Sequence, residues 1–206
     1  MARLRRFACA SALAALITTV GLGVAAPPAS AGLLGCGPQT IEHPFTAWDD
    51  DASYVLATGG SAESPVGWAL RGGATVVGGN EPFYVHSASD SHSVAIPSGA
   101  SASTPWTCIE LKDPTLRFFV ANLGSQQSTL RIDVQYRTIL GTVSHQVTTV
   151  SADEWQPSGT YLYLANLTGI LALDGVTSTV SFRFTAQGSG GNWRVDDVYV
   201  DPWVLL

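Results

Sequence analysis

Lysine is almost absent from this chain of 206 residues, and basic residues as a class are few. Lys112 is the single lysine, and ten basic residues stand against sixteen acidic ones, which gives a formal net charge of −6. Nucleic-acid binding needs clustered Lys and Arg side chains that neutralise phosphates. The composition therefore predicts no nucleic-acid partner.

Sequence motifs of several enzyme and metal-site classes are also missing. The chain has no G-x-S-x-G nucleophile elbow, no HExxH zinc pattern and no EF-hand spacing in the acidic run at residues 49–51. His86, Asp90 and His92 form H-x3-D-x-H, but the serine-rich segment between them specifies no metal geometry. We expect the acidic run to be a solvated turn and the two histidines to be surface residues.

Catalysis by a carboxylate pair stays open, because such a pair has no sequence signature. A glycosidase needs two carboxylates facing each other across a cleft. The sequence does not place any two acids together. The candidates are Glu81, Glu110, Asp113 and Glu154.

Helical periodicity is missing, whereas period-2 alternation is frequent. Apolar and polar residues alternate over residues 116–121, 130–135 and 180–185, and clusters rich in Gly, Pro, Ser and Asn separate the stretches. This pattern predicts half-buried antiparallel strands, and many short strands with regular breaks predict a sandwich or barrel. We expect an all-β, antiparallel jelly-roll β-sandwich.

The first 31 residues have the anatomy of a secretory signal peptide. A short basic start precedes an uncharged apolar run, two prolines and a small-residue triplet that ends at Ala31. Cleavage there would leave residues 32–206, enough for a single domain with a sizeable core. Seven basic and sixteen acidic residues would remain, a net charge of −9. We expect a secreted, extracellular protein without a transmembrane anchor after processing.

Cysteine is scarce. Cys9 lies in the predicted leader, so Cys36 and Cys108 remain as an even pair in an oxidising compartment. This favours one disulfide, which would contribute about 4 kcal/mol in the chain-entropy model. As an alternative, Leu33-Leu34-Gly35-Cys36 is a lipobox that anchors the protein through Cys36. Lipidation would leave Cys108 without a partner, so the disulfide is the preferred interpretation.

Two adjacent acids interrupt the last expected strand, residues 193–201. Alternation from Trp193 places Asp197 on one face and Asp196 on the other, so either a carboxylate points into the core or a β-bulge shifts the phase. A buried carboxylate needs a cation or several donors, and calcium, an arginine or a loop amide network would serve. We expect this strand to pair with residues 179–186 as a hairpin.

Two segments resemble galactose-binding-like jelly-roll domains of the carbohydrate-binding-module type. One holds Glu63, Gly67-Trp68-Ala69-Leu70 and Gly73-Ala74-Thr75-Val76-Val77, and the other is residues 193–202. Ala62 departs from the pattern, which usually has an aromatic residue there. The chain is also similar to a class of secreted actinobacterial proteins, a likeness that implies nothing about activity.

The resemblance implies a non-catalytic module that binds carbohydrate, often with a structural calcium ion. Carried over to this sequence, it implies Asp197 and Glu63 as calcium ligands. The ion's role would be structural, since calcium binds carboxylate and carbonyl oxygens and so fixes the segments that supply them.

Aromatic residues supply possible stacking surfaces for sugar rings. Trp68 and Trp193 are in phase with apolar neighbours and are predicted to lie in the core. Trp155 lies in an edge or loop context. The predicted ligand-binding residues are Trp155, Tyr161 and Tyr163, with Tyr84 and Trp106 in reserve.

We expect the protein to bind a saccharide or cell-envelope glycan by aromatic stacking and by hydrogen bonds from Asn, Gln and Asp side chains. Two rival functions remain. A secreted hydrolase would show two close carboxylates in a concave groove. A cell-surface interaction protein would show an exposed apolar patch instead.

Overall fold

The computed structural model describes residues 36–110, 113, 115–138, 140–162 and 177–201. All of them belong to one compact unit, Ala31–Leu206. The predicted leader and the predicted ligand-binding residue Tyr163 lie outside the described residues. None of the described residues belongs to a helix with the length and hydropathy of a membrane span.

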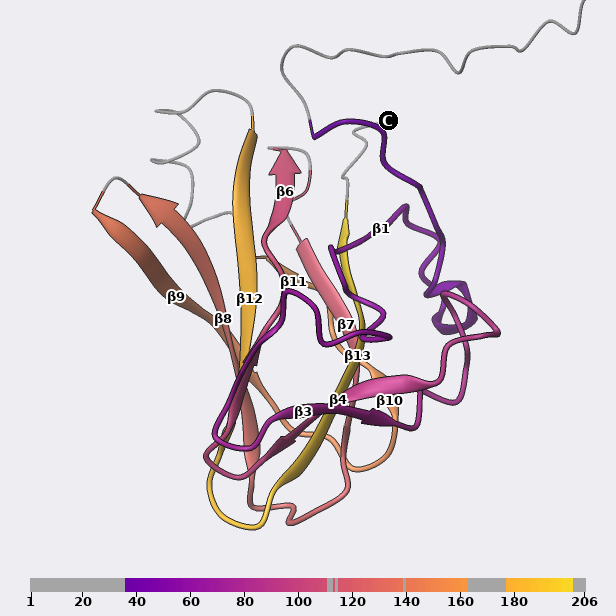
Figure 1. Cartoon of the computed structure of the whole chain (residues 1–206). Coiled ribbons are helices and arrows are strands. Elements are labelled where there is room, and N and C mark those ends of the chain that lie inside the picture. The colour runs from indigo at the N-terminus through magenta and orange to yellow at the C-terminus, as the bar shows by residue number, and fades with distance from the viewer. Residues whose placement is uncertain (1–35, 111–112, 114, 139, 163–176, 202–206) are drawn as a thin grey trace, which may run out of the picture. The chain divides into compact units, whose positions relative to one another are not determined.

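The described strands form two antiparallel sheets (Figure 1). The seven-stranded sheet contains β1 (Val55–Leu56), β3 (Thr75–Gly78), β4 (His92–Pro97), β7 (Thr115–Asn122), β10 (Gln156–Pro157), β11 (Tyr161–Leu162) and β13 (Asn192–Asp201). The six-stranded sheet contains β2 (Ala69–Arg71), β5 (Ser101–Ser103), β6 (Thr107–Glu110), β8 (Thr129–Thr138), β9 (Gly141–Val150) and β12 (Thr177–Gln187). A 3₁₀ turn, η1 (Thr46–Trp48), precedes β1.

Strand order shows how the chain winds between the sheets. The main path is β10-β7-β13-β4-β3 in the seven-stranded sheet and β2-β5-β12-β8-β9 in the six-stranded sheet. Successive strands cross repeatedly from one sheet to the other, as in a jelly roll. The predicted all-β, antiparallel sandwich is confirmed.

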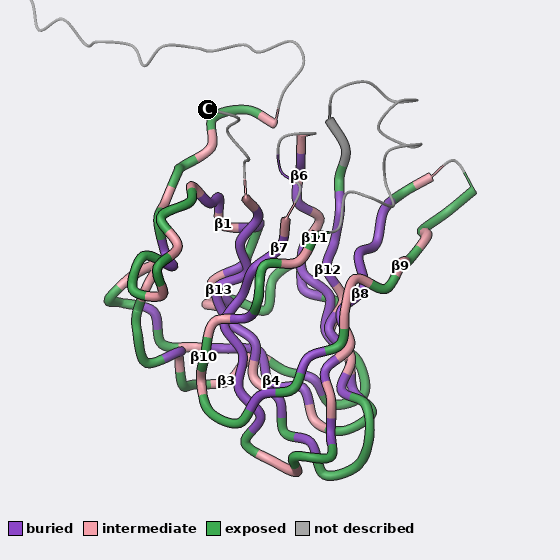
Figure 2. Tube along the Cα trace, turned by 180° about the vertical axis from the view of Figure 1, so that it is seen from behind, coloured by how far each residue is buried: buried purple, intermediate pink, exposed green. Residues whose placement is uncertain are grey.

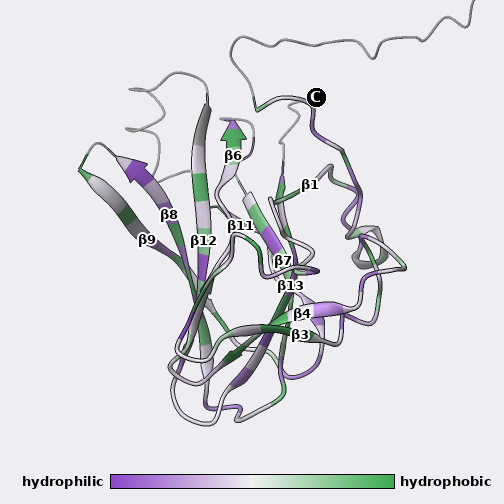
Figure 3. Cartoon of the chain, in the orientation of Figure 1, coloured by the Kyte–Doolittle hydropathy of each residue, from purple (hydrophilic) through white to green (hydrophobic). Residues whose placement is uncertain are grey.

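The core lies between the sheets because one phase of each strand is apolar. Phe182 and Phe184 of β12 and Ile132 and Val134 of β8 are fully buried there, with Trp193 of β13. Figure 2 shows the buried positions concentrated on β7, β8, β12 and β13. Figure 3 shows that hydrophobic and hydrophilic residues both occur along β12. Trp68 also belongs to this core, so both predicted core tryptophans are confirmed.

The predicted hairpin between the last two strands is wrong. β12 pairs with β5, β6 and β8, whereas β13 pairs with β1, β4 and β7. Residues 188–191 carry the chain from one sheet to the other. The physical reason is that the apolar phase of a strand shows that it faces a core but does not show which sheet it joins.

The disulfide between Cys36 and Cys108 is confirmed. The two Cα atoms are 5.5 Å apart, and the cysteines are 72 residues apart in the sequence. The bond ties the start of the described chain to β6. A sulfur in a disulfide is not free to form the thioether of a lipoprotein, which counts against the lipobox interpretation of Cys36.

A second aromatic cluster covers the outer face of the seven-stranded sheet. Phe45, Tyr54, Phe119 and Tyr199 are buried in it. Phe119 stacks on Phe45 with ring centroids 5.3 Å apart, while its neighbour Phe118 points into the main core. We call this outer surface the covered face. Side chains on both faces of β7 are therefore buried, on one face by the main core and on the other by the aromatic cluster.

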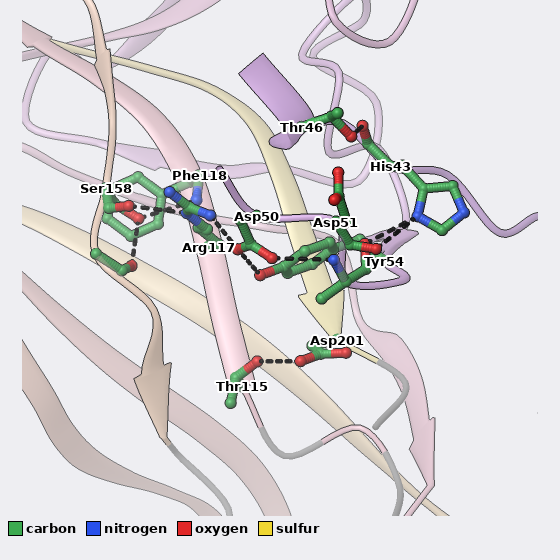
Figure 4. Close-up of polar contacts among 12 residues, drawn as sticks. His43, Thr46, Asp50, Asp51, Tyr54, Thr115, Arg117, Phe118, Ser158 and Asp201 are labelled. Atoms are coloured by element: carbon green, nitrogen blue, oxygen red, sulfur yellow. Dashed lines mark hydrogen bonds and ion pairs between the residues drawn. The ribbon is translucent and has the colours of Figure 1, made fainter. Parts of the chain in front are cut away.

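A nearly buried ion pair holds the N-terminal segment on the covered face (Figure 4). Arg117 of β7 donates to the Asp50 carboxylate and, through Nε, to the Ser158 carbonyl at 3.0 Å. Its guanidinium carbon lies 4.1 Å from the Phe45 ring centroid. The Tyr54 hydroxyl also donates to Asp50 Oδ2, at 2.7 Å. The acidic run is therefore not wholly solvated, because its middle residue points inward.

Candidate functional site

The outer face of the six-stranded sheet contains a groove of about 340 Å³. We call this surface the groove face. The described residues that line the groove are Gly67, Ala69, Arg71, Ser103, Thr104, Trp106, Gln135, Thr142, Ser144, Ser181 and Arg183.

Strand alternation explains why the groove is polar. On β12, Ser181 and Arg183 alternate with three core residues, and on β8, Gln135 follows the core residue Val134. The strands are in register here: Arg183 lies opposite Ser103 of β5, and Gln135 lies opposite Ser144 of β9. The same phase that builds the core thus aligns hydroxyl, amide and guanidinium groups across the sheet.

Trp106 is the aromatic residue of the groove. Its ring is half-buried, and the guanidinium carbon of Arg137 lies 4.4 Å from the ring centroid. Gly67 lies beside it with φ 84°, and a Cβ at that position would lie 3.0 Å from Pro105 Cγ. Only glycine accepts both constraints readily, so residue 67 lets this wall of the groove lie flat against Pro105.

The groove offers stacking and hydrogen-bond donation, without carboxylate chemistry. None of its described lining residues is Asp or Glu. Ser181 is already engaged, because its hydroxyl donates to the Thr104 carbonyl at 2.7 Å. Gln135, Ser144 and the arginines are the polar groups that face the groove from neighbouring strands.

Trp155 and Tyr161 are the two predicted ligand-binding residues that the structure describes, and it does not bring them onto one surface. Trp155 packs against the aromatic cluster of the covered face. Tyr161 packs against the main core, with its ring centroid 6.3 Å from that of Phe118. The two side chains therefore lie against opposite faces of the seven-stranded sheet, and only Trp106 of the reserves lies in the groove.

Trp155 belongs to an exposed apolar patch. With Pro82, Phe83, Leu123 and Glu154 it lines a depression of about 410 Å³. Phe83 and Leu123 are 44% and 56% exposed. The patch lies on the covered face and shares no residue with the groove.

The predicted calcium ligand Glu63 is occupied by hydrogen bonds. Its Oε1 accepts from the Ser91 and His92 amides at 2.7 and 2.8 Å, and its Oε2 accepts from the Ser91 hydroxyl at 3.2 Å and lies 3.0 Å from His92 Nδ1. Although burial acts in the opposite direction, these contacts lower the pKa of Glu63 below its ordinary value. Glu63 thus fixes the backbone that follows Asp90.

The carboxylate of the predicted calcium ligand Asp197 has no hydrogen-bond partner within the described part of the chain, although the Asp197 backbone amide donates to Asp196 Oδ1 at 2.9 Å. It is fully buried, and neither carboxylate oxygen is satisfied. The register of β13 against β7 shifts between Asp196 and Tyr199, and Asp197 has φ 44°, so the bulge alternative is confirmed. Burial, followed by the charge of Glu81, raises the pKa of Asp197 to about 7. Burial and the Asp197 charge raise that of Asp196 to about 9.

Two further buried acceptor oxygens have no hydrogen-bond partner in the described residues, one on Asp90 and one on Asn80. The Asp90 carboxylate contributes to the raised pKa of Asp197, and Asp90 Oδ2 is buried and unsatisfied. Asn80 Oδ1 is unsatisfied too, and Asn80 precedes Glu81, whose amide donates to Asp196 Oδ2 at 3.1 Å. Buried acceptors without donors suit a hard cation with oxygen ligands. In the described residues, no three His, Cys, Asp or Glu side chains are arranged to hold an ion by themselves, so amide or carbonyl oxygens would have to contribute.

The H-x3-D-x-H residues do not converge on one point. His86 Nδ1 lies 3.2 Å from Glu42 Oε2, whereas His92 pairs with Glu63. Of the carboxylates considered for hydrolysis, Glu110 and Asp113 lie together, since Asp113 Oδ2 accepts from the Glu110 amide at 2.7 Å. Neither lines the groove. Glu81 is buried elsewhere and accepts from the Val85 amide, and Glu154 lines the apolar patch.

Sequence reasoning missed most of the groove. Arg71, Gln135 and Arg183 were not singled out, because each looks like an ordinary polar residue on a solvated strand face. Their phase was readable: each alternates with apolar neighbours. What could not be read was that β2, β5, β12, β8 and β9 lie side by side, because that order is set by long-range pairing.

Similarity to known proteins is confined to solved structures. No model of a known protein family matches the sequence, and no curated protein is significantly similar to it. The CBM22-1 xylan-binding domain from Paenibacillus barcinonensis Xyn10C superposes with a TM-score of 0.43 at 16% identity, covering 73% of this chain and 94% of that one.

A second structure is the family 11 carbohydrate-binding module of a cellulosomal cellulase from Clostridium thermocellum, with a TM-score of 0.43 at 13% identity, covering 73% of this chain and 95% of the module. A family 6 carbohydrate-binding module superposes with a TM-score of 0.39 at 11% identity, covering 64% and 83%. These are domains of the kind that the sequence resembles. A likeness at this level says nothing about the ligand of this chain.

Proposed function

We propose that the protein is a secreted, non-catalytic saccharide-binding protein whose ligand lies in the groove of the six-stranded sheet. One observation carries the proposal. The groove combines the half-buried ring of Trp106 with aligned hydroxyl, amide and guanidinium donors, and its described lining contains no carboxylate.

The chemistry of a sugar matches this lining. The apolar face of a pyranose ring packs on an aromatic face, while its hydroxyl groups need donors and acceptors at the edges. Hydrolysis of a glycosidic bond would need an acid and a second carboxylate beside it. The groove supplies the first set of groups and not the second, which supports binding without cleavage. The disulfide supports export, because such bonds persist in oxidising compartments.

A binding screen tests this proposal. The oxidised protein would be titrated with soluble saccharides and incubated with insoluble polysaccharides, including cell-envelope glycans. We expect saturable binding to one glycan class and a loss of about tenfold or more in affinity for Trp106→Ala. Circular dichroism would show that the variant is folded.

Trp155→Ala is the matched control, because Trp155 is a half-buried tryptophan on the opposite sheet. We expect it to leave affinity unchanged. If Trp155→Ala abolishes binding and Trp106→Ala does not, the ligand lies on the surface predicted from the sequence and the groove proposal is wrong. Absence of binding to any glycan by the folded protein would refute saccharide binding itself.

We also propose that a calcium ion binds at Asp197, with the side-chain oxygens of Asp90 and Asn80 as further candidate ligands. The buried, unsatisfied carboxylate supports this proposal. A direct role for Glu63 stays a prediction, since its two oxygens already have four contacts. The ion would stabilise the fold by neutralising the buried charge.

A further inference from the structure

Basic residues are concentrated on the groove face, although the protein as a whole is acidic. Arg131, Arg137 and Arg183 occupy outward positions of β8 and β12, since their strand neighbours are core residues, and Arg71 is exposed on β2. These four are more than half of the seven basic residues that follow the predicted leader.

Carboxylates on the groove face are few in the described residues. Asp133 of β8 is buried and accepts from Arg131 Nη2 at 2.6 Å. Glu110 lies at the far end of β6, outside the groove, where it accepts from the Cys36 amide at 3.2 Å. None of the remaining described acids lines the groove. The groove is therefore a local region of positive charge on a negative protein.

Two arginines are available to a ligand. Arg71 and Arg183 both line the groove, and neither forms an ion pair within the part of the chain that the structure describes. They lie on β2 and β12 with β5 between them, so about 10 Å separates their strands. An oligosaccharide lying across the groove would therefore pass both side chains.

A guanidinium group recognises planar or tetrahedral anions by paired hydrogen bonds, which a neutral hydroxyl cannot match. The formal net charge, which is −6 for the whole chain and would be −9 without the predicted leader, repels an anionic ligand at long range. The groove keeps two arginines without ion pairs and has no carboxylate in its described lining, which compensates for this repulsion where the saccharide is proposed to bind.

We infer that the groove selects saccharides that carry anionic groups. In this inference Arg71 and Arg183 bind the anionic groups, and Trp106 stacks on the sugar ring. This inference rests on the proposed saccharide binding at the groove. The shared ligand chemistry is a sugar bearing carboxylate, phosphate or sulfate.

The decisive experiment compares the binding of one polysaccharide in an anionic form and in a neutral form. Polygalacturonate and its fully methyl-esterified form have the same backbone, and only the first is anionic. We expect at least tenfold tighter binding of the acid form at low ionic strength, a difference that salt reduces. A glycerol-phosphate polymer and dextran sulfate beside dextran would identify the preferred anion, and a single-stranded oligonucleotide would test whether a sugar ligand is required.

Variants separate the roles of the residues. Arg183→Gln and Arg71→Gln should each weaken binding of the acid polymer about tenfold and leave binding of the ester unchanged. Arg183→Lys should restore part of the loss, since it keeps the charge and not the paired donors. Arg194→Gln removes the same charge from the other sheet and should change nothing. Trp106→Ala should weaken both polymers.

The outcomes are distinct. Equal affinity for acid and ester forms, with loss on Trp106→Ala alone, would overturn the charge inference and leave saccharide binding standing. An oligonucleotide that binds as tightly as the best acidic polysaccharide would also overturn it, because the groove would then recognise polyanions in general. If no polymer of any charge binds to the folded protein, both the inference and the proposed function fail.

Discussion

The outer faces of the two sheets differ in what lies on top of them. The covered face of the seven-stranded sheet lies beneath an aromatic layer built on Phe119 and Tyr199, and it encloses carboxylates such as Asp197. The groove face of the six-stranded sheet carries arginines, hydroxyls and one half-buried indole. Both sheets contribute to the same core, so the difference concerns only the phase that points away from it. On the seven-stranded sheet that phase is packed beneath the aromatic layer, and on the six-stranded sheet it lines the groove.

The largest expected effect is the loss of a ring beneath the aromatic layer. Phe119 is fully buried and contacts Phe45, Trp48 and Phe83. Phe119→Ala should lower the free energy of unfolding by about 4 kcal/mol, from lost burial and the cavity left behind. Urea unfolding measures this, with Thr142→Ala on the groove face as a control expected to stay within about 0.5 kcal/mol. Equal effects at the two positions would contradict the contrast between the faces.

Calcium binding should raise the free energy of unfolding by somewhat less than Phe119→Ala is expected to lower it. Saturation at a hundredfold excess over Kd corresponds to about 3 kcal/mol, seen as a rise in Tm that a chelator reverses. Asp197→Asn should abolish this rise. Without calcium the variant should be no less stable than the wild-type protein, because it loses a buried charge that repels Glu81 and Asp90. A Tm that changes with neither calcium nor chelator would refute the calcium proposal.

The ion pair that holds the N-terminal segment should have a smaller, pH-dependent effect. Burial alone would raise the pKa of Asp50, but hydrogen bonds from Tyr54 and the Ala52 amide and the charge of Arg117 lower it below its ordinary 3.8. A carboxyl whose folded-state pKa is depressed stabilises the fold above its unfolded-state pKa and loses that contribution as pH falls.

Asp50→Asn should therefore cost about 2 kcal/mol at pH 7. The difference from the wild-type protein should begin to shrink below about pH 4, where the carboxyl of the unfolded chain becomes protonated, and it should be lost as pH falls through the lower folded-state pKa. Urea unfolding at pH 7 and at pH 3 measures this difference. Asp49→Asn changes an exposed neighbour and is the matched control. A cost that is the same at pH 7 and pH 3 would show that the charge of Asp50 is not what holds the segment.

The smallest effect on stability is expected for the arginines that face the groove. Arg183→Gln removes no described ion pair and should change the free energy of unfolding by less than about 0.5 kcal/mol. The same variant is expected to change ligand affinity. Thermal unfolding measured beside the binding titrations would separate the two quantities. A large loss of stability would mean that Arg183 supports the sheet and is not held free for a ligand.

Local pattern was sufficient for some features and not for others. Alternation around Phe182 and Ile132 predicted half-buried strands correctly, and it placed Trp68 and Trp193 in the core. The same alternation led to a wrong hairpin for β12 and β13, because an apolar phase says that a strand faces a core and not which sheet it joins.

The candidate site shows the same limit. Tryptophan content suggested stacking at Trp155, yet that side chain packs into the layer of the covered face. Trp106 and Arg183 lie 77 positions apart and meet only because β12 pairs with β5 and β6. Net charge predicted no nucleic-acid partner, but a sum over the chain carries no information about where its few arginines gather.

The sequence by itself determined the class of fold, the disulfide partners and the presence of an irregularity at Asp196 and Asp197, because each depends on local periodicity or on counting. Tertiary structure alone decided which sheet each strand joins, which outer face is covered and where the free arginines lie. These features depend on pairings between residues distant in the chain, whose free energy comes from packing the two sheets together and not from any single segment.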